Sequence, residues 1–218
     1  MSKKKLVIFD LDGTLLDTIA DLAQATNQAL QTLGFPTHPQ ESYYRFVGSG
    51  INKLFERALP ENARTEENIL KVRALFVPYY DTHNAVLTRP YSGIVELLDS
   101  LQTQGMILAI ASNKYQSATE KLVKHYFPKI NFSSVLGQRE GLPVKPDPLF
   151  VREILDKTQV TVQDTLYVGD SDVDMMTARN AGVEACAVTW GFRSKEELLS
   201  YHPAFVADKA EEIGKILF

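Results

Sequence analysis

The chain has 218 residues, of which 44% are hydrophobic and 23% are charged. This length allows one large hydrophobic core, or a core domain with a smaller second domain. A net charge of −4 and a pI near 5.6 argue against nucleic acid as the main partner. Cys186 is the only cysteine, so no disulfide can form within one chain. No apolar run approaches the ~18 residues that a membrane span needs, and we expect a cytoplasmic protein without a membrane partner.

Short apolar runs that predict buried strands alternate with segments of helical periodicity along the chain. The strands are expected at residues 6–9, 107–111, 134–136, 165–168 and 185–189. The helices between the later strands are expected at residues 94–104, 118–126, 148–158 and 172–181. This alternation predicts an α/β fold with a Rossmann-like parallel sheet, covered by helices on both faces. Ligands of such sheets collect at the carboxyl ends of the strands.

The connection between the first two strands is far longer than the dozen or so residues of a normal crossover. Its surplus contains three stretches of helical spacing, which begin near Leu22, Ile51 and Ile69. We therefore expect an inserted all-helical cap domain at residues 17–88. The α/β core would consist of residues 1–16 and 89–218.

The first strand runs directly into two acidic residues, Asp10 and Asp12, which Gly13 follows. Residues i and i+2 of an extended chain project to the same side, and glycine permits a sharp turn after them. A strand-to-turn junction, where aspartate is common, explains the pair as well as a functional site does. Two neighbouring carboxylates are costly unless something positive joins them. The functional interpretation makes Asp10 a nucleophile and Asp12 a general acid/base.

Three later segments place further polar side chains at strand ends or in loops. Ser112 follows the second strand and offers a hydroxyl group suited to phosphate oxygens. Lys145 lies in a loop that two prolines stiffen. Asp170 ends the fourth strand, and Asp174 follows one helical turn later. A calcium-loop interpretation fails because the loop lacks glycine at its sixth position and glutamate at its twelfth, whereas Asp170 as a magnesium ligand supported by Asp174 fits.

Each segment alone is weak evidence, since solvated lysines and helix-capping aspartates are common. Together they supply acids for a hard cation, donors for phosphate oxygens, and one lysine. At ~4 Å and an effective dielectric of ~20, two unit charges interact by ~4 kcal/mol, so a carboxylate approaching a phosphate dianion faces ~8 kcal/mol of repulsion. Mg²⁺ prefers oxygen ligands and commonly bridges protein and phosphate, which offsets a repulsion of that size. The segments therefore predict a magnesium-assisted phosphoryl-transfer site.

In this order, the segments resemble the four signature motifs of the haloacid dehalogenase-like hydrolases. The matching residues are Asp10-x-Asp12-Gly13-Thr14, Ser112, Lys145 with Pro146, and Gly169-Asp170-Ser171-x-x-Asp174. The resemblance covers nearly the whole chain, including the helical insertion. It implies that Asp10 takes the phosphoryl group as an aspartyl phosphate, and that Asp12 protonates the leaving oxygen and later activates water.

The resemblance also implies which residues bind phosphate and metal. The implied phosphate-binding residues are Thr14, Ser112, Asn113 and Lys145. The implied magnesium ligands are Asp10, the backbone carbonyl of Asp12, and Asp170, with Asp174 supporting that shell.

One segment of the expected cap, Phe46-Val47-Gly48-Ser49-Gly50, looks like the corresponding segment of phosphoglycolate phosphatases. A glycine-hinged turn between two helices explains it equally well. Arg45, Gly48, Ser49 and Lys53 are candidate substrate contacts because they form or flank this turn. The leading prediction is a magnesium-dependent phosphatase of a small phosphorylated metabolite, with phosphoglycolate as the leading candidate. We expect this enzyme to act as a monomer or homodimer.

Two other functions use similar residues. A sugar-phosphate mutase of the β-phosphoglucomutase type would carry the same motifs and return the phosphoryl group to a sugar phosphate instead of to water. A non-enzymatic phospho-receiver module also combines clustered acids, a hydroxyl residue and a lysine on a parallel sheet. Receivers lack a long helical insertion and carry the acceptor aspartate on a later strand. A dehalogenase is disfavoured because it needs no second acid, and Asp12 is present.

Overall fold

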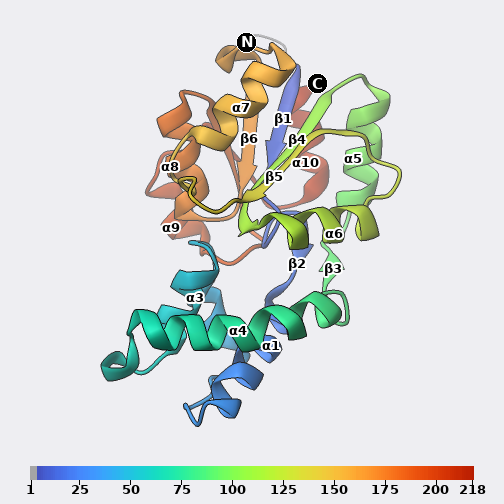
Figure 1. The fold of residues 1–218 in the computed structure, drawn as a ribbon. Helices are drawn as coiled ribbons and strands as arrows, with labels where there is room; N and C mark the ends of the chain where they lie inside the picture. Colours follow the sequence, from blue (N-terminus) through green and yellow to red (C-terminus); the bar gives the residue numbers. More distant parts are fainter. Residues whose placement is uncertain (1–3) are drawn as a thin grey trace.

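The computed structural model describes residues 4–218, and within them six strands form one sheet in the order β5-β4-β1-β6-β7-β8. Every pair of neighbouring strands is parallel, as the alternation of strands and helices predicted (Figure 1). The strands are β1 (Leu6–Phe9), β4 (Ile107–Tyr115), β5 (Phe132–Gln138), β6 (Thr165–Gly169), β7 (Glu184–Val188) and β8 (Phe205–Ala207).

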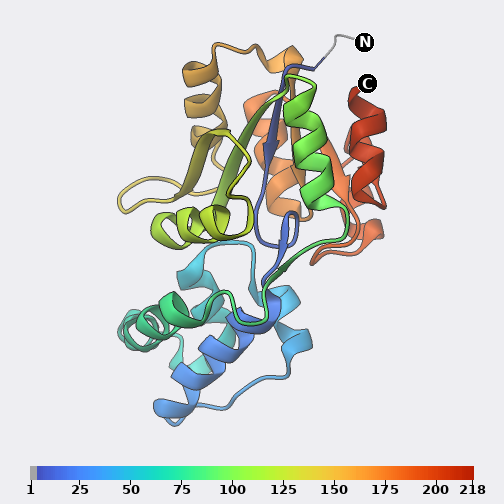
Figure 2. The same cartoon turned by 90° about the vertical axis from the view of Figure 1, so that its right-hand side faces the viewer.

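Helices cover both faces of this sheet, as Figure 2 shows. Val7 and Phe9 of β1 pack into one cluster with side chains of α5, α6 and α10. Leu6 and Ile8 point the other way and pack with side chains of α7, α8 and α9. Because both faces are buried, these strands read as continuous apolar runs and not as alternating ones. The helices are α5 (Ile94–Thr103), α6 (Gln116–Tyr126), α7 (Leu149–Thr158), α8 (Asp172–Ala181), α9 (Lys195–Leu199) and α10 (Ala210–Leu217).

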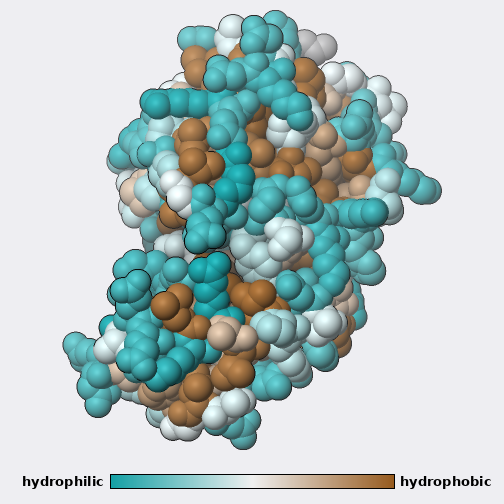
Figure 3. Space-filling model, viewed as in Figure 1, coloured by the Kyte–Doolittle hydropathy of each residue, from teal (hydrophilic) through white to brown (hydrophobic). Residues whose placement is uncertain are grey.

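Four further helices form a separate group at the carboxyl end of the strands, which we call the helical layer (Figures 1 and 2). They are α1 (Ile19–Thr32), α2 (Gln40–Phe46), α3 (Ile51–Ala58) and α4 (Glu66–His83). Their apolar faces share one hydrophobic cluster, in which Phe55, Phe76 and Tyr80 are fully buried. The helical layer thus has a core of its own. On the face in Figure 3, hydrophilic residues separate scattered hydrophobic patches over both the sheet part and the helical layer.

The chain leaves the sheet for the helical layer and returns through two short paired strands. β2 (Leu16–Asp17) runs antiparallel to β3 (Arg89–Pro90). The buried carboxylate of Asp21 accepts hydrogen bonds from the backbone N–H groups of Leu87 and Thr88 and from the Thr88 hydroxyl, which ties the returning segment to α1. We propose this strand pair as the boundary between a helical cap domain, residues 17–88, and the α/β core, residues 1–16 and 89–218.

Some elements were not predicted from the sequence. α2 buries only Tyr43, so its apolar pattern is weak. β8 has three residues, and α9 has five, of which only Leu198 is buried. The strand expected at residues 107–111 continues to Tyr115, which carries Ser112 and its neighbours on β4 itself. None of the helices in residues 4–218 has the length and apolar character that crossing a membrane requires.

Candidate active site

Three buried carboxylates converge at the carboxyl edge of the sheet. β1 and β6 are neighbours, and Phe9 pairs with Val168, so Asp10 and Asp170 leave the sheet side by side. Asp174 reaches the same place from the first turn of α8. Carboxylate oxygens of Asp10, Asp170 and Asp174 all lie within 4.8 Å of one another. The sheet topology therefore assembles acids that lie 160 positions apart in the sequence.

Asp170 is fully buried and held at both carboxylate oxygens. The Thr14 hydroxyl donates to Oδ1 at 2.8 Å, and the Phe192 backbone N–H donates to Oδ2 at 2.8 Å. Glycines make the space for this side chain: a Cβ atom on Gly13 would lie 2.3 Å from Oδ2, and one on Gly191 would lie 2.2 Å from the Cβ of Asp170. Burial raises the pKa of Asp170 well above its ordinary value, and the charges of Asp174 and Asp10 raise it further.

Asp174 is also fully buried, and its two carboxylate oxygens have different partners. Oδ2 accepts from the backbone N–H and the hydroxyl of Ser171, at 3.1 and 2.5 Å, in a capping box that starts α8. Oδ1 accepts from the Lys145 ammonium at 2.7 Å and from the Tyr167 hydroxyl at 3.1 Å. Asp174 therefore fixes the start of α8 and the lysine at the same time.

Lys145 supplies the positive charge inside this acidic cluster. Its side chain is 2% exposed, and Nζ lies 2.9 Å from Oδ1 of Asp10 and 2.7 Å from Oδ1 of Asp174. Burial alone would lower the pKa of this ammonium, but the charges of Asp10 and Asp174 raise it well above its ordinary value. Burial and the charge of Asp174 raise the pKa of Asp10 to about 7, against the opposing effect of Lys145. The lysine therefore stays charged while Asp10 holds a proton far more tightly than an exposed aspartate.

The cluster has the composition of a site for a hard divalent cation. Three carboxylates face one ammonium, so the fully ionised cluster has an uncompensated charge of −3 + 1 = −2. Buried like charges at this spacing are costly without a further positive group. The donor atoms are all oxygens, which suits Mg²⁺.

Asp12 lies beside this cluster and has a different partner. Its carboxylate is paired with the ammonium of Lys114, whose Nζ lies 3.0 and 3.1 Å from the two carboxylate oxygens. Lys114 is 3% exposed, and its ammonium also lies 4.8 Å from the centre of the Tyr80 ring in α4. Asp12 is not among the three acids whose oxygens meet, so its side chain is free for a role other than metal binding.

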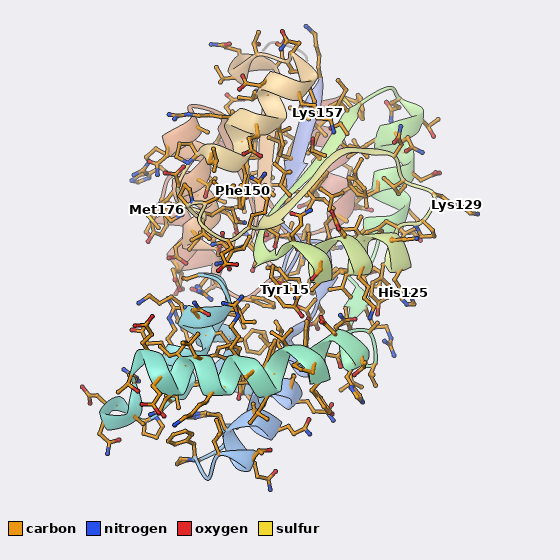
Figure 4. The ribbon with its side chains drawn as sticks, viewed as in Figure 1. Tyr115, His125, Lys129, Phe150, Lys157 and Met176 are labelled. Atoms are coloured by element: carbon orange, nitrogen blue, oxygen red, sulfur yellow. The ribbon has the colours of Figure 1, made fainter. Side chains whose placement is uncertain are left out.

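Asp10 and Asp12 open into a pocket between the sheet edge and the helical layer. The sheet side contributes Ser112, Asn113, Lys114 and Tyr115, and the helical side contributes mainly apolar residues of α1, α3 and α4 and the turn at Gly48. In Figure 4, Tyr115 lies where α6 approaches α4. Its hydroxyl donates to Asp81 of α4 at 2.6 Å. The two parts of the molecule therefore close this pocket together.

The residues predicted to bind phosphate reach the site in different ways. Ser112 lines the pocket, and its hydroxyl oxygen accepts the backbone N–H of Lys114 at 3.3 Å. The Asn113 side chain accepts the Lys145 N–H at 2.8 Å and donates to the carbonyls of Lys145 and Gly48, at 3.0 and 3.1 Å. Asn113 thus positions the lysine loop and the helical layer, and the hydroxyl of Thr14 is bonded to Asp170.

Of the candidate substrate contacts in the helical layer, Gly48 lines the pocket. Arg45 and Lys53 are exposed and pair with Glu197 and Glu56 at 2.9 and 2.6 Å. The Ser49 hydroxyl oxygen accepts from Arg57 at 3.0 Å. Substrate contacts by Arg45, Ser49 and Lys53 therefore stay predictions.

The sequence did not identify the segment that follows β7 as part of the site. The backbone N–H of Phe192 binds Asp170, and Gly191 leaves room for the side chain of Asp170. The next residue, Arg193, is buried against the helical layer. Its guanidinium donates to the backbone carbonyls of Tyr44 and Val47, the latter at 3.1 Å, and to the carboxylate of Asp172 at 3.2 Å. Nothing in the local pattern indicates this role, because it depends on the position of the helical layer.

Lys114 was also given no role, although its position carried a signal. It lies two residues after Ser112, in the part of β4 where the pairing with β5 is irregular, and both residues line the pocket.

Comparisons with known proteins agree with this geometry. The sequence profile of the haloacid dehalogenase-like hydrolases matches residues 7–188. The chain is 33% identical to the phosphoglycolate phosphatase of Vibrio parahaemolyticus over 218 residues, which cover 98% of this chain and 96% of that protein. It is 32% identical to the Vibrio cholerae phosphoglycolate phosphatase, with 100% and 97% covered. The crystal structure of a predicted phosphoglycolate phosphatase from Haemophilus somnus superimposes with a TM-score of 0.92, 28% identity and full coverage of both chains. The chain therefore belongs to the haloacid dehalogenase-like hydrolases, as a phosphoric monoester hydrolase of the phosphoglycolate phosphatase-like group.

Proposed function

We propose that the protein is a magnesium-dependent phosphatase that hydrolyses a small phosphomonoester through an aspartyl-phosphate intermediate. The leading candidate substrate is phosphoglycolate. The observation that carries this proposal is the position of Asp10. Its carboxylate lines the pocket, lies 2.9 Å from the Lys145 ammonium, and shares a site with two further buried carboxylates. A carboxylate in this position can contact a phosphate group bound in the pocket, while the Lys145 ammonium balances its negative charge.

In the first step, a carboxylate oxygen of Asp10 attacks phosphorus and the ester oxygen leaves. Lys145 opposes the repulsion between this carboxylate and the phosphate, and Ser112 offers a hydroxyl to the transferring group. The side chains of Asp10 and Asp170 and the backbone carbonyl of Asp12 would hold Mg²⁺, with Asp174 supporting them. When bound, the ion supplies positive charge between the carboxylates and the phosphate oxygens.

Asp12 is suited to proton transfer because its carboxylate lines the pocket outside the three-acid cluster. It gives a proton to the leaving oxygen in the first step and takes one from water in the second, when water attacks the aspartyl phosphate. The apolar side chains of the helical layer exclude bulk water from the pocket, which strengthens the charge interactions inside it. The products are the free alcohol and inorganic phosphate.

The substrate proposal rests on the relatives. Phosphoglycolate phosphatases match this chain over nearly its full length, and the pocket between the sheet and the helical layer suits a small ester. The direct test is a panel of phosphomonoesters that includes phosphoglycolate and sugar phosphates, with and without Mg²⁺, in which free phosphate is measured. Phosphate release from phosphoglycolate that depends on Mg²⁺ supports the proposal. Interconversion of sugar phosphates without phosphate release would contradict it.

The pKa of Asp10 predicts how stability depends on pH and Mg²⁺. An aspartate with an ordinary value of 3.8 in the unfolded chain and about 7 in the fold binds its proton more tightly when folded. The metal-free protein should therefore lose stability as the pH rises between these values. Bound Mg²⁺ replaces the proton, so we expect it to raise the melting temperature more at about pH 8 than at about pH 5. Differential scanning fluorimetry at both pH values measures this.

Two variants show whether that shift comes from the proposed site. Asp170→Asn removes one ligand and should lose most of the stabilisation by Mg²⁺. Asp208→Asn changes an exposed acid that pairs with Lys195, and it should respond as the unmodified protein does. An equal Mg²⁺ shift at both pH values, or one that Asp170→Asn retains in full, would contradict the assignment.

A further inference from the structure

The pocket contains one buried cation that the proposed mechanism does not use. Besides Asp10 and Asp12, Lys114 is the only charged residue among those that line it. Lys145 lies on the far side of Asp10, where it contacts Asp174 and Tyr167. A buried lysine is uncommon unless it is paired, and one that faces a binding pocket is a candidate for ligand recognition.

The Lys114 ammonium is incompletely satisfied. Nζ carries three N–H donors, and Asp12 is its only hydrogen-bond acceptor among residues 4–218, at 3.0 and 3.1 Å. At least one donor therefore has no protein acceptor. Since Asp12 serves the leaving oxygen, the group next to Asp12 in the pocket faces the leaving alcohol and not the transferring phosphate. This position distinguishes Lys114 from Lys145.

A second polar group on the same side of the pocket lacks a partner. Tyr80 is fully buried and lines the pocket, and its hydroxyl oxygen has no hydrogen-bond partner in the described part of the chain. Its ring lies against the Lys114 ammonium, 4.8 Å from Nζ to the ring centre. Unpaired hydroxyls are rare in protein interiors, and one on a residue that lines a pocket is a candidate partner for an oxygen atom of a ligand.

We propose that Lys114 and Tyr80 recognise an anionic group on the leaving alcohol, a carboxylate attached directly to the carbon that bears the ester oxygen, and so determine specificity. The inference rests on the proposed phosphatase function and adds the residues that select its substrate. Lys114 supplies the charge from β4, and Tyr80 comes from α4, so the recognition site is complete only when the sheet and the helical layer are packed together. The apolar residues that the helical layer contributes to the lining surround the short carbon chain between the two anionic ends.

The test compares two esters of equal carbon number, phosphoglycolate and ethyl phosphate, which has a methyl group in place of the carboxylate. We expect the unmodified enzyme to have the higher kcat/KM with phosphoglycolate. Lys114→Met should lower the ratio of the two kcat/KM values by about 10- to 100-fold, the size expected for losing a charged hydrogen bond. The loss should occur mainly as a higher KM for phosphoglycolate.

The comparison of esters separates recognition from positioning. If Lys114 only orients Asp12, Lys114→Met lowers kcat/KM for both esters by the same factor, and the inference is overturned. Tyr80→Phe removes a single hydroxyl without a protein partner, so it should fold normally and shift the ratio in the same direction. An unchanged ratio in Tyr80→Phe would remove that residue from the site.

Matched controls use residues outside the pocket. Lys71→Met removes an exposed lysine of α4 that pairs with Glu67, and Tyr79→Phe removes the neighbouring tyrosine hydroxyl. Both should keep the ratio of the unmodified enzyme. A wild-type enzyme that releases phosphate from neither ester would refute the proposed function itself. One that hydrolyses both equally well would leave that function standing and refute only the carboxylate site.

Discussion

Asp10→Asn is expected to lower phosphate release by at least ~10³-fold, because an amide cannot supply the attacking oxygen. The substitution keeps the size of the side chain and removes one of three crowded buried carboxylates. The fold should therefore survive, and the metal-free variant should be no less stable than the unmodified protein at about pH 8. Steady-state phosphate release gives the activity, and circular dichroism with thermal unfolding gives the state of the fold.

The control for Asp10 is a second aspartate-to-asparagine change, at an exposed position outside the acidic cluster. Asp208→Asn affects a surface pair and should retain full turnover. Trapping the aspartyl phosphate after brief exposure to substrate adds a chemical test, since only a protein with Asp10 intact should become labelled. Turnover by Asp10→Asn above about one per cent of the normal rate would contradict the nucleophile assignment.

Lys145→Met should have the second-largest effect, because it acts on both stability and catalysis. The ammonium is 2% exposed and contacts Asp10 and Asp174, so its removal leaves two buried carboxylates without their counter-charge. Breaking a buried ion pair from one side costs about 3–5 kcal/mol of unfolding free energy. Activity should fall by roughly 10²-fold or more, since a charge that opposes phosphate repulsion is lost. Urea unfolding at about pH 8 measures the first effect and turnover the second.

Lys157→Met provides the matched control for this change. Lys157 is an exposed residue of α7, as Figure 4 shows, and it donates to the Ser133 carbonyl. Its replacement should change the unfolding free energy by less than about 1 kcal/mol. Mg²⁺ should restore part of the stability of Lys145→Met, because the ion replaces the missing positive charge. Equal unfolding free energies for the two lysine variants would show that the buried ammonium is not needed to balance the acids.

The sequence predicted the sheet well because its strands are buried on both faces. Leu6–Phe9 is a continuous apolar run, Thr165–Gly169 has an apolar centre, and every residue of both strands is buried. The helical insertion followed from the length of the first crossover. The order of the strands could not be deduced from their patterns, and neither could β8, whose three residues pair only at the edge beyond β7. Short helices such as α9 owe their position to neighbours that are distant in sequence.

In the candidate site too, the features set by residues close in sequence could be predicted, and those set by contacts between distant segments could not. Asp170, Ser171 and Asp174 are close in sequence, and the strand-to-helix junction alone places them. The convergence of Asp10, Asp170 and Asp174 agrees with the motif interpretation, while the chemical roles of these residues stay proposals. Contacts across the two parts of the molecule had no sequence signal, because they depend on how the helical layer packs on the sheet. Arg193 and Tyr80 belong to this class, as does the pairing of Arg45 with Glu197.

The segment from Gly191 to Arg193 has a mechanical consequence for the enzyme. The Phe192 backbone N–H donates to an oxygen of Asp170, and the guanidinium of Arg193 donates to a backbone carbonyl of the helical layer. The peptide between these two anchor points is too short to absorb a large displacement. Separating the helical layer from the sheet must either break the contacts of the Arg193 guanidinium or displace the carboxylate of Asp170. If substrate enters by separation of the helical layer from the sheet, that movement is coupled to the geometry of the acidic centre through Phe192 and Arg193.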